Sequence, residues 1–409
     1  MVIPIDPDHA MPDNHRLYFL DWLRILAFFL LILYHTGMYY VTWDWHVKSP
    51  HASSAIEPLM LLTSPWRMSL LFLVSGVASA FLLRKLATVT FIRERSARLL
   101  VPLLFGMLVI VPPQPYFEVA GKLGYAGSYT DFMKLYLHAY GGFCKEGECL
   151  TLPTWNHLWY LPYVWTYTLL LAALAAMLGR ERIERAGAAL ARLLGGWKAL
   201  VLPAALLAVI RIALKPHFEE THALVDDWFN HATYLPLFLA GAALSGQAAF
   251  WRELERLRFA ALGTALACWV VLVACHRNPE AIQAWLTPAR VVWTTCQWCA
   301  VAAACGFARR HLSHDGPARQ YLAQAVFPVY ILHQTLIVCF TQLLRPAALP
   351  PLMEGIVLVA MTVAASFGIF EIVRRVPPLR PLFGLKMRAA AMPATAAQPP
   401  GQADSRVVS

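Results

Sequence analysis

Three ionisable residues interrupt one long apolar run near the amino terminus, where a helix in a lipid bilayer rarely carries any. They are Asp21, Arg24 and His35, in the run RLYFLDWLRILAFFLLILYHTGMYY. On an α-helix, eleven positions separate Arg24 from His35, which is about 1100° of rotation and about 16.5 Å of rise, so both lie near one face. Asp21 precedes Arg24 by three positions and joins that face. We therefore expect a polar stripe along this helix.

A neutral imidazole at the depth of His35 could act as a general base toward a hydroxyl group, or it could bind a metal ion. The sequence offers no supporting histidine or carboxylate at ligand spacing in this run, so we expect general-base chemistry and no metal. The simpler alternative is an Asp21–Arg24 ion pair at the membrane interface, with His35 as a packing residue. A weak metal site remains an alternative elsewhere, in a dense polar set made of His217, His222, Asp226, Asp227 and His231.

Two further groups of residues could serve the same chemistry. His157 begins the fourth apolar run. His333 lies midway through the ninth, where it could line a substrate path or bond across helices. Aromatic residues near His157 could stack on sugar rings or form an interfacial belt; they are Trp155, Trp159, Tyr160 and Tyr163, with Trp43 and Trp45. Arg95 and Arg98 are expected in a short loop before the third run, where they could bind phosphate or mark the cytoplasmic side.

The composition indicates that these residues belong to a membrane protein. The 409 residues are 58% hydrophobic and only 14% charged, with a mean hydropathy of +0.52, whereas soluble domains average roughly 25% charged residues. A soluble, disordered, collagenous or disulfide-stapled secreted protein is excluded. Ten apolar runs are long enough to cross a hydrocarbon layer of about 30 Å; they cover approximately 17–41, 60–83, 99–118, 155–178, 197–214, 231–248, 259–275, 288–308, 321–343 and 354–373.

The distribution of basic residues predicts the orientation. The net charge is +10, and most Lys and Arg residues fall in alternate loops, as the positive-inside rule requires, rather than in a patch suited to nucleic acid. We therefore expect an all-α polytopic membrane protein with about ten transmembrane helices and both termini in the cytoplasm. The expected parts are a cytoplasmic segment 1–16, an integral-membrane domain 17–388 and a disordered tail 389–409, which is rich in Ala, Pro and Gln.

The cysteines divide into two groups. Six lie in apolar runs, where a thiol behaves as a small hydrophobic group. Cys144 and Cys149 lie in a polar loop expected outside the cytoplasm and could form a disulfide there.

Several of these patterns, in order, resemble the membrane acyltransferase family 3, whose members acylate sugars of glycans and lipopolysaccharides. The opening Leu20-Asp21-x-x-Arg24 and Arg24-x10-His35 are similar to that family's first motif. The resemblance continues to residue 385, and one segment is similar to the branch that contains the glucan biosynthesis C proteins. The later matching segments are LFLVSG at 71–76, Arg95-x-x-Arg98-Leu99 with Pro102, WNHLWYL at 155–161 (the segment of that branch), YILH at 330–333 and Glu371-x-x-Arg374-Arg375.

This resemblance implies a multi-pass O-acyltransferase of the bacterial inner membrane. It would move an acetyl or succinyl group from cytoplasmic acyl-CoA to a hydroxyl of an extracytoplasmic carbohydrate, without a tightly bound cofactor. His35, Arg24 and Asp21 are the expected catalytic residues, and substrate binding is expected at Arg95, Arg98, Trp155, His157, Trp159 and His333. Direct transfer and transient acylation of His35 both stay open. The alternative function is a transporter or flippase of a glycan, lipid or small anion.

Overall fold

The computed structural model describes residues 17–278, 280 and 285–387, which are predominantly helical. The expected cytoplasmic segment 1–16 and the expected tail 389–409 lie outside the described residues. The helices and strands are α1 (Tyr18–Tyr40), α2 (Glu57–Thr63), α3 (Arg67–Lys85), α4 (Thr88–Phe105), a π-helical turn (Gly106–Ile110), α5 (Pro113–Leu123), α6 (Tyr129–Leu137), β1 (Cys144–Lys145), β2 (Glu148–Cys149), a 3-10 turn (Asn156–Trp159), α7 (Tyr160–Leu178), α8 (Arg180–Leu193), α9 (Lys198–Leu214), α10 (Trp228–Leu244), α11 (Ala248–Arg277), α13 (Leu286–His311), α14 (Pro317–Leu344), α15 (Pro351–Arg375) and α16 (Leu379–Leu382), with short 3-10 turns at Ser54–Ile56 and Arg345–Ala347.

The helices confirm an all-α membrane architecture. By length and composition, seven helical segments of the described chain can cross a membrane, or up to nine if each of two bent pairs is one span. The bent pairs are Thr88–Ile110 with Pro113–Leu123, at 42°, and Arg180–Leu193 with Lys198–Leu214, at 105°. The expected run at 231–248 corresponds to α10, a helix of 17 residues that is not among these spans. Ten spans and cytoplasmic termini therefore stay predictions.

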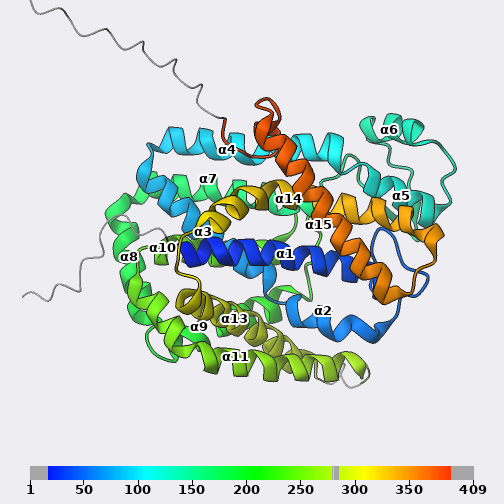
Figure 1. Ribbon diagram of the computed structural model, residues 1–409. Helices are drawn as coiled ribbons and strands as arrows, with labels where there is room; N and C mark the ends of the chain where they lie inside the picture. The colour runs from blue at the N-terminus through cyan, green and yellow to red at the C-terminus, as the bar shows by residue number, and fades with distance from the viewer. Residues whose placement is uncertain (1–16, 279, 281–284, 388–409) are drawn as a thin grey trace, which may run out of the picture.

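Helix α1, which carries the polar stripe, crosses the middle of the molecule (Figure 1). It packs against α13, α14, α15 and α3, and 13 of its 23 residues are buried. The three ionisable side chains of its stripe all bond to residues of α14. Because α14 runs beside it, residues that are about 300 positions apart in the chain become neighbours.

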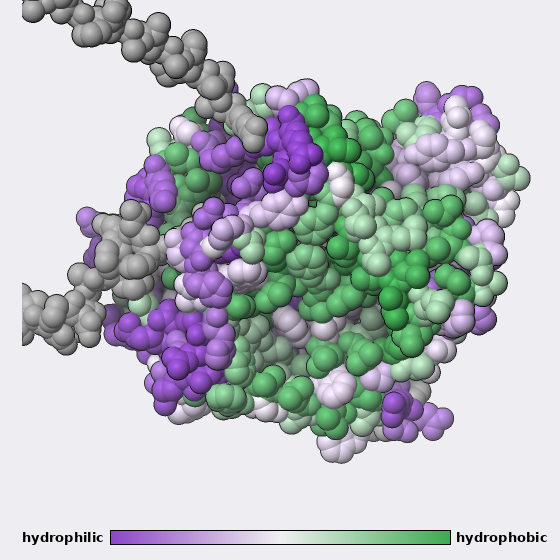
Figure 2. Space-filling view, in the orientation of Figure 1, coloured by the Kyte–Doolittle hydropathy of each residue, from purple (hydrophilic) through white to green (hydrophobic). Residues whose placement is uncertain are grey.

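The outer surface of the helices is strongly apolar. Figure 2 shows a broad hydrophobic face across the middle of the molecule, with hydrophilic residues gathered toward the end where α8 lies. Large apolar side chains point outward, including Leu33 in α1, which is 55% exposed, and Phe259 in α11, which is 66% exposed. Exposed apolar surface on this scale is suited to lipid and not to water.

The glycine of the second motif brings two helices together. A Cβ atom added at Gly76 in α3 would lie 1.9 Å from the backbone oxygen of Phe238 in α10, and one at Gly241 would lie 2.1 Å from the oxygen of Leu73. The sequence predicts this close approach of helices at Ser75-Gly76, and the packing of α3 on α10 confirms it.

The basic segment before the third run is helical, so the expected short loop around Arg93, Arg95 and Arg98 is wrong. Helix α4 already begins at Thr88 and contains all three arginines. No Gly or Pro stands between Thr88 and Leu100, and Arg and Glu are good helix formers, so a charged stretch can extend the helix. The helix turns Arg95 inward, where it donates to Ser79 of α3 and Thr168 of α7, and leaves Arg93 and Arg98 exposed.

The long segment after α5 forms a small unit of its own. Helix α6 packs on α5, and the strands β1 and β2 pair as an antiparallel hairpin. Cys144 and Cys149 are joined by a disulfide in this hairpin, as the sequence allowed. The other six cysteines are free thiols.

Candidate active site

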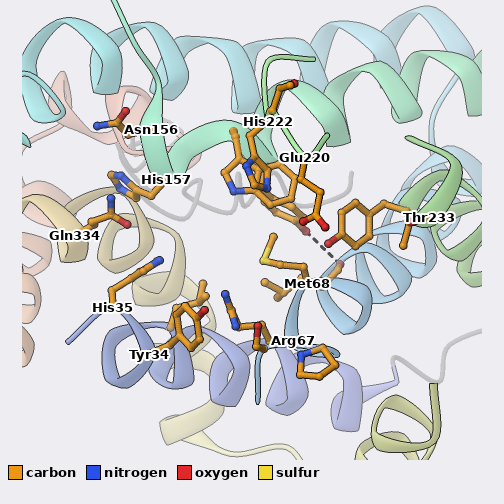
Figure 3. A pocket seen from close by; sticks show the side chains of 18 of the residues that line it. Tyr34, His35, Arg67, Met68, Asn156, His157, Glu220, His222, Thr233 and Gln334 are labelled. Atoms are coloured by element: carbon orange, nitrogen blue, oxygen red, sulfur yellow. Dashed lines mark hydrogen bonds between the residues drawn. The ribbon is translucent and has the colours of Figure 1, made fainter. Parts of the chain in front are cut away.

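His35, the predicted catalytic histidine, lines a cavity of about 580 Å³. His35 contributes to its wall from α1. The rest of the wall comes mainly from α3, α7, α9, α10, α13 and α14 and from the segments that follow α1, precede α7 and precede α10. Figure 3 shows His35 and Arg67 on either side of Tyr34, with His222 and Glu220 facing them across the cavity. The cavity is large enough for a small ligand or one part of a larger one.

Two hydrogen bonds determine which nitrogen of His35 faces this space. Nδ1 of His333 lies 2.7 Å from the backbone oxygen of Tyr330, which can only accept, so Nδ1 of neutral His333 carries the proton. Nε2 of His333 is then an acceptor, and it lies 2.8 Å from Nδ1 of His35. His35 therefore donates through Nδ1. Its Nε2 makes no hydrogen bond to any described residue and keeps a lone pair for chemistry.

His157 plays a different part from His35, although both lie at the cavity. Its Nε2 donates to the backbone oxygen of Ile331, at 3.1 Å, and its Nδ1 accepts from the side-chain amide of Gln114, at 3.2 Å. The hydroxyl of Tyr330 donates to the backbone oxygen of His157, at 2.6 Å. Both ring nitrogens are thus used within the protein. These bonds hold the segment of α14 that carries His333.

His46, another histidine of the cavity, belongs to a chain of hydrogen-bonded polar side chains that the sequence analysis missed. Nδ1 of His46 lies 2.5 Å from the carboxylate of Glu118, and Nε2 accepts from Gln334, at 3.0 Å. Gln334 also donates to Gln114, at 2.9 Å. Because Gln334 is adjacent to His333 and Gln114 also donates to His157, this chain and His157 hold the same segment of α14.

Aromatic rings form much of the remaining wall. Trp45, Trp155, Trp159 and Tyr160 all line the cavity. Trp159 packs on His222 at a centroid distance of 4.3 Å, and burial lowers the pKa of His222 from its ordinary value of 6.5. Of the expected aromatic cluster, Trp43 packs on His276 and Tyr163 bonds to Asp227, so these two belong to neighbouring contacts.

Arg67 and Arg211 are cavity residues that the sequence analysis did not single out. The guanidinium of Arg67 lies 3.3 Å from the centroid of the Tyr34 ring, and that of Arg211 lies 4.6 Å from the ring of Trp293. Both arginines stand in expected membrane runs, 60–83 and 197–214. The signal that singled out Arg24, a charge inside an apolar run, therefore applied to them too.

The acidic and basic residues of the stripe form a separate cluster. Asp21 pairs with Arg24, at 3.7 Å, and more closely with Arg319 of α14, at 2.6 Å. Arg24 donates to the backbone oxygen of Ala323, at 3.5 Å, and interacts electrostatically with Arg95 and Arg98. This cluster joins α1 to α14 and gathers positive charge beyond the end of the cavity.

The cavity and the cluster meet at Tyr160. Its hydroxyl bonds to Ser75 and donates to the backbone oxygen of Leu71, at 3.1 Å. Tyr160 lines the cavity and interacts electrostatically with both Arg24 and Arg95. Tyr160 thus belongs to both the cavity wall and the surroundings of the arginines.

The structure accordingly divides the predicted site residues into two places. His35, His157, Trp155 and Trp159 line the cavity, and the buried His333 bonds to His35 from behind the wall. Asp21, Arg24, Arg95 and Arg98 lie in the cluster. Among the described residues there is no group of three or more His, Cys, Asp and Glu side chains that could hold a metal ion. The arrangement offers a base in an aromatic cavity and, separately, guanidinium groups suited to phosphate.

Comparison with known proteins relates the chain to acyltransferases. The chain matches the acyltransferase 3 family model, described as an acyltransferase domain, over residues 17–371. The glucans biosynthesis protein C of Salmonella agona and that of Salmonella paratyphi A are each 24% identical over 381 residues, which cover 91% of this chain and 95% of the relative. No solved structure matches the chain.

Proposed function

The chain belongs to the acyltransferase 3 family, and we propose that this membrane acyltransferase moves an acyl group from cytoplasmic acyl-CoA to a hydroxyl of an extracytoplasmic carbohydrate. The observation that carries the proposal is the lone pair on Nε2 of His35, held toward an aromatic cavity by the bond between His35 and His333. A base in that position can activate a hydroxyl group.

The reaction is an acyl transfer with one proton relayed. The acceptor hydroxyl attacks the thioester carbonyl carbon while Nε2 of His35 takes the hydroxyl proton. The new carbon–oxygen bond forms, the carbon–sulfur bond breaks, and the imidazolium returns its proton to the departing thiolate. His333 accepts a hydrogen bond from Nδ1 of His35 throughout and stabilises the charged ring. If His35 instead carries the acyl group, the same nitrogen attacks first.

The arginine cluster supports an acyl-CoA donor. Guanidinium groups match phosphate oxygens, and the exposed Arg98 is placed to meet a ligand from outside the helix bundle. Arg24 and His35 are about 16.5 Å apart along α1. The donor would therefore lie along α1, with its phosphates at the cluster and its thioester past Tyr160.

The aromatic wall supports a carbohydrate acceptor. Trp155 and Trp159 present flat apolar faces beside polar side chains, a combination that suits sugar rings, which have apolar faces and polar edges. The names of the curated relatives favour a glucan, and a bacterial inner membrane would place that glucan on the outer side. No step requires a tightly bound cofactor. Transport without ester formation is the alternative, and membership of an acyltransferase family argues against it.

The decisive experiment is acyl transfer by purified protein in detergent, with labelled acyl-CoA and an oligosaccharide acceptor. We expect His35→Ala to lower kcat by about 10² to 10⁴, the usual contribution of a general base. His138→Ala is the matched control, because His138 is exposed at the end of α6. It should retain the wild-type rate. Wild-type transfer by His35→Ala would refute the proposal. Substrate accumulation in vesicles without a new ester would favour transport.

A further inference from the structure

Arg67, in the wall of the cavity, forms no ion pair with any carboxylate of the described residues. Its Nε and Nη1 atoms are buried and have no hydrogen-bond partner among the described residues. The ring of Tyr34, 3.3 Å below the guanidinium, offers only a cation–π contact. Burying a charged group with unmatched donors costs free energy. A ligand that accepts those hydrogen bonds would recover that cost.

The carboxylates of the cavity do not neutralise Arg67. Asp44 and Glu220 are the acidic residues of its wall, and each is already paired with a lysine: Asp44 with Lys122, at 2.8 Å, and Glu220 with Lys215, at 2.7 Å. Arg211, the other arginine of the wall, likewise forms no ion pair with a described carboxylate. The cavity therefore holds an excess of positive charge.

The positive charge of Arg67 lies in the same cavity wall as His35, the proposed base. The guanidinium of Arg67 lies over the ring of Tyr34, which immediately precedes His35, and its charge acts on His35, His222 and Tyr234. Figure 3 shows Arg67 extending into the same space as His35. A group bound by Arg67 would thus be part of the substrate near the bond being formed.

We propose that Arg67 is a specificity residue that binds a carboxylate or phosphate group of one of the two substrates while His35 acts on the hydroxyl. This inference rests on the proposed function and deepens it, because it specifies an anionic substrate. The anion has two possible carriers: the far end of a dicarboxylic acyl group, or an acidic substituent on the carbohydrate. Both present oxygen atoms that accept from a guanidinium fork.

The activity test compares pairs of substrates that differ only in the anion. One arm uses succinyl-CoA and acetyl-CoA with a neutral β-glucan oligosaccharide; the other uses acetyl-CoA with that oligosaccharide and with its phosphate ester. Arg67→Gln should lower the anionic-to-neutral ratio of kcat/KM by roughly tenfold in one arm, the loss expected for one charge-assisted hydrogen bond. Arg67→Lys keeps the charge and should lose less. The arm that responds identifies the carrier.

The matched control is Arg345→Gln, which removes an exposed positive charge after α14, away from the cavity. It should leave both ratios unchanged. If Arg67→Gln leaves both ratios unchanged, or lowers the rate with neutral and anionic substrates equally, the proposal is overturned.

A binding measurement separates this inference from the proposed function. Succinate or methyl phosphate should raise the unfolding temperature of the purified wild-type protein and should do so less for Arg67→Gln. Failure of the wild type to transfer any acyl group would refute the proposed function alone. Failure of both anions to stabilise the wild type, or equal stabilisation of the variant, would refute the anion site.

Discussion

Nδ1 of His35 lies 2.8 Å from Nε2 of His333, although 298 positions separate the two residues in the chain. Their rings stack at a centroid distance of 5.0 Å, and the proton order within the pair is set by the backbone oxygen of Tyr330. The hydrogen bond to His333 fixes the tautomer of His35, so that its proton is on Nδ1 and its lone pair is on Nε2. His333 therefore acts as a positioning residue for His35.

Replacing His333 should reduce turnover more than substrate binding. In His333→Leu, Nδ1 of His35 loses its acceptor, so the ring can rotate or change tautomer; we expect kcat to fall by about tenfold, the value of one hydrogen bond to a charging group, with KM for acyl-CoA unchanged. His333→Gln restores an acceptor oxygen and should recover part of kcat. Steady-state kinetics on folded, monodisperse variants would measure both. Wild-type kcat in His333→Leu would contradict this role.

Arg98 should affect the donor and not the acceptor. Because it is exposed and interacts electrostatically with Arg24 in the positive cluster, we expect Arg98→Gln to raise KM for acyl-CoA by about tenfold through the loss of a phosphate contact, with kcat nearly unchanged. Arg93→Gln is the matched control, since Arg93 is exposed on the same helix. Equal KM values in the two variants would speak against a phosphate site at Arg98.

Acid should destabilise the protein partly through His222. Burial lowers the pKa of this histidine in the folded protein, so the unfolded chain binds the proton more readily, and stability is lost as pH falls below about 6.5. His222→Asn removes this titration, and Asn tolerates the positive φ of 55° at that position. The drop in unfolding temperature between about pH 7.5 and about pH 5.5 should be smaller in the variant. An unchanged drop would contradict the assignment.

The membrane helices were predictable because their signal is local. Apolar length alone located α1, α7, α13, α14 and α15 to within a few residues, since a bilayer core demands a minimum run of apolar residues. The pattern was weaker where helices break. Pro112 and Pro113 bend the third run. The charged start of α4 was predicted to be a loop because it is polar, but charged residues, unlike Gly or Pro, do not end a helix.

The site was predictable where polar residues interrupted an apolar run or where aromatic residues clustered beside one, as at Trp155 and Trp159. The first signal found Arg24 and His35, and it would have found Arg67 and Arg211 if applied to every run. His46 and Gln334 had no such signal. His46 lies in a loop, and Gln334 matters because its amide meets His46 and Gln114.

Residue types and their spacing alone thus establish a helical membrane protein with a polar stripe on its first helix, because hydropathy and helical periodicity are properties of neighbouring residues. They cannot decide which stripe residue faces open space or what partner it has. Only the packing of whole helices does that. The packing of α14 against α1 pairs His35 with His333 and ties Asp21 to Arg319. The packing of α3 against α1 sets Arg67 over Tyr34, where two of its nitrogens have no hydrogen-bond partner among the described residues. Such contacts join residues distant in the chain, so they depend on how whole helices pack.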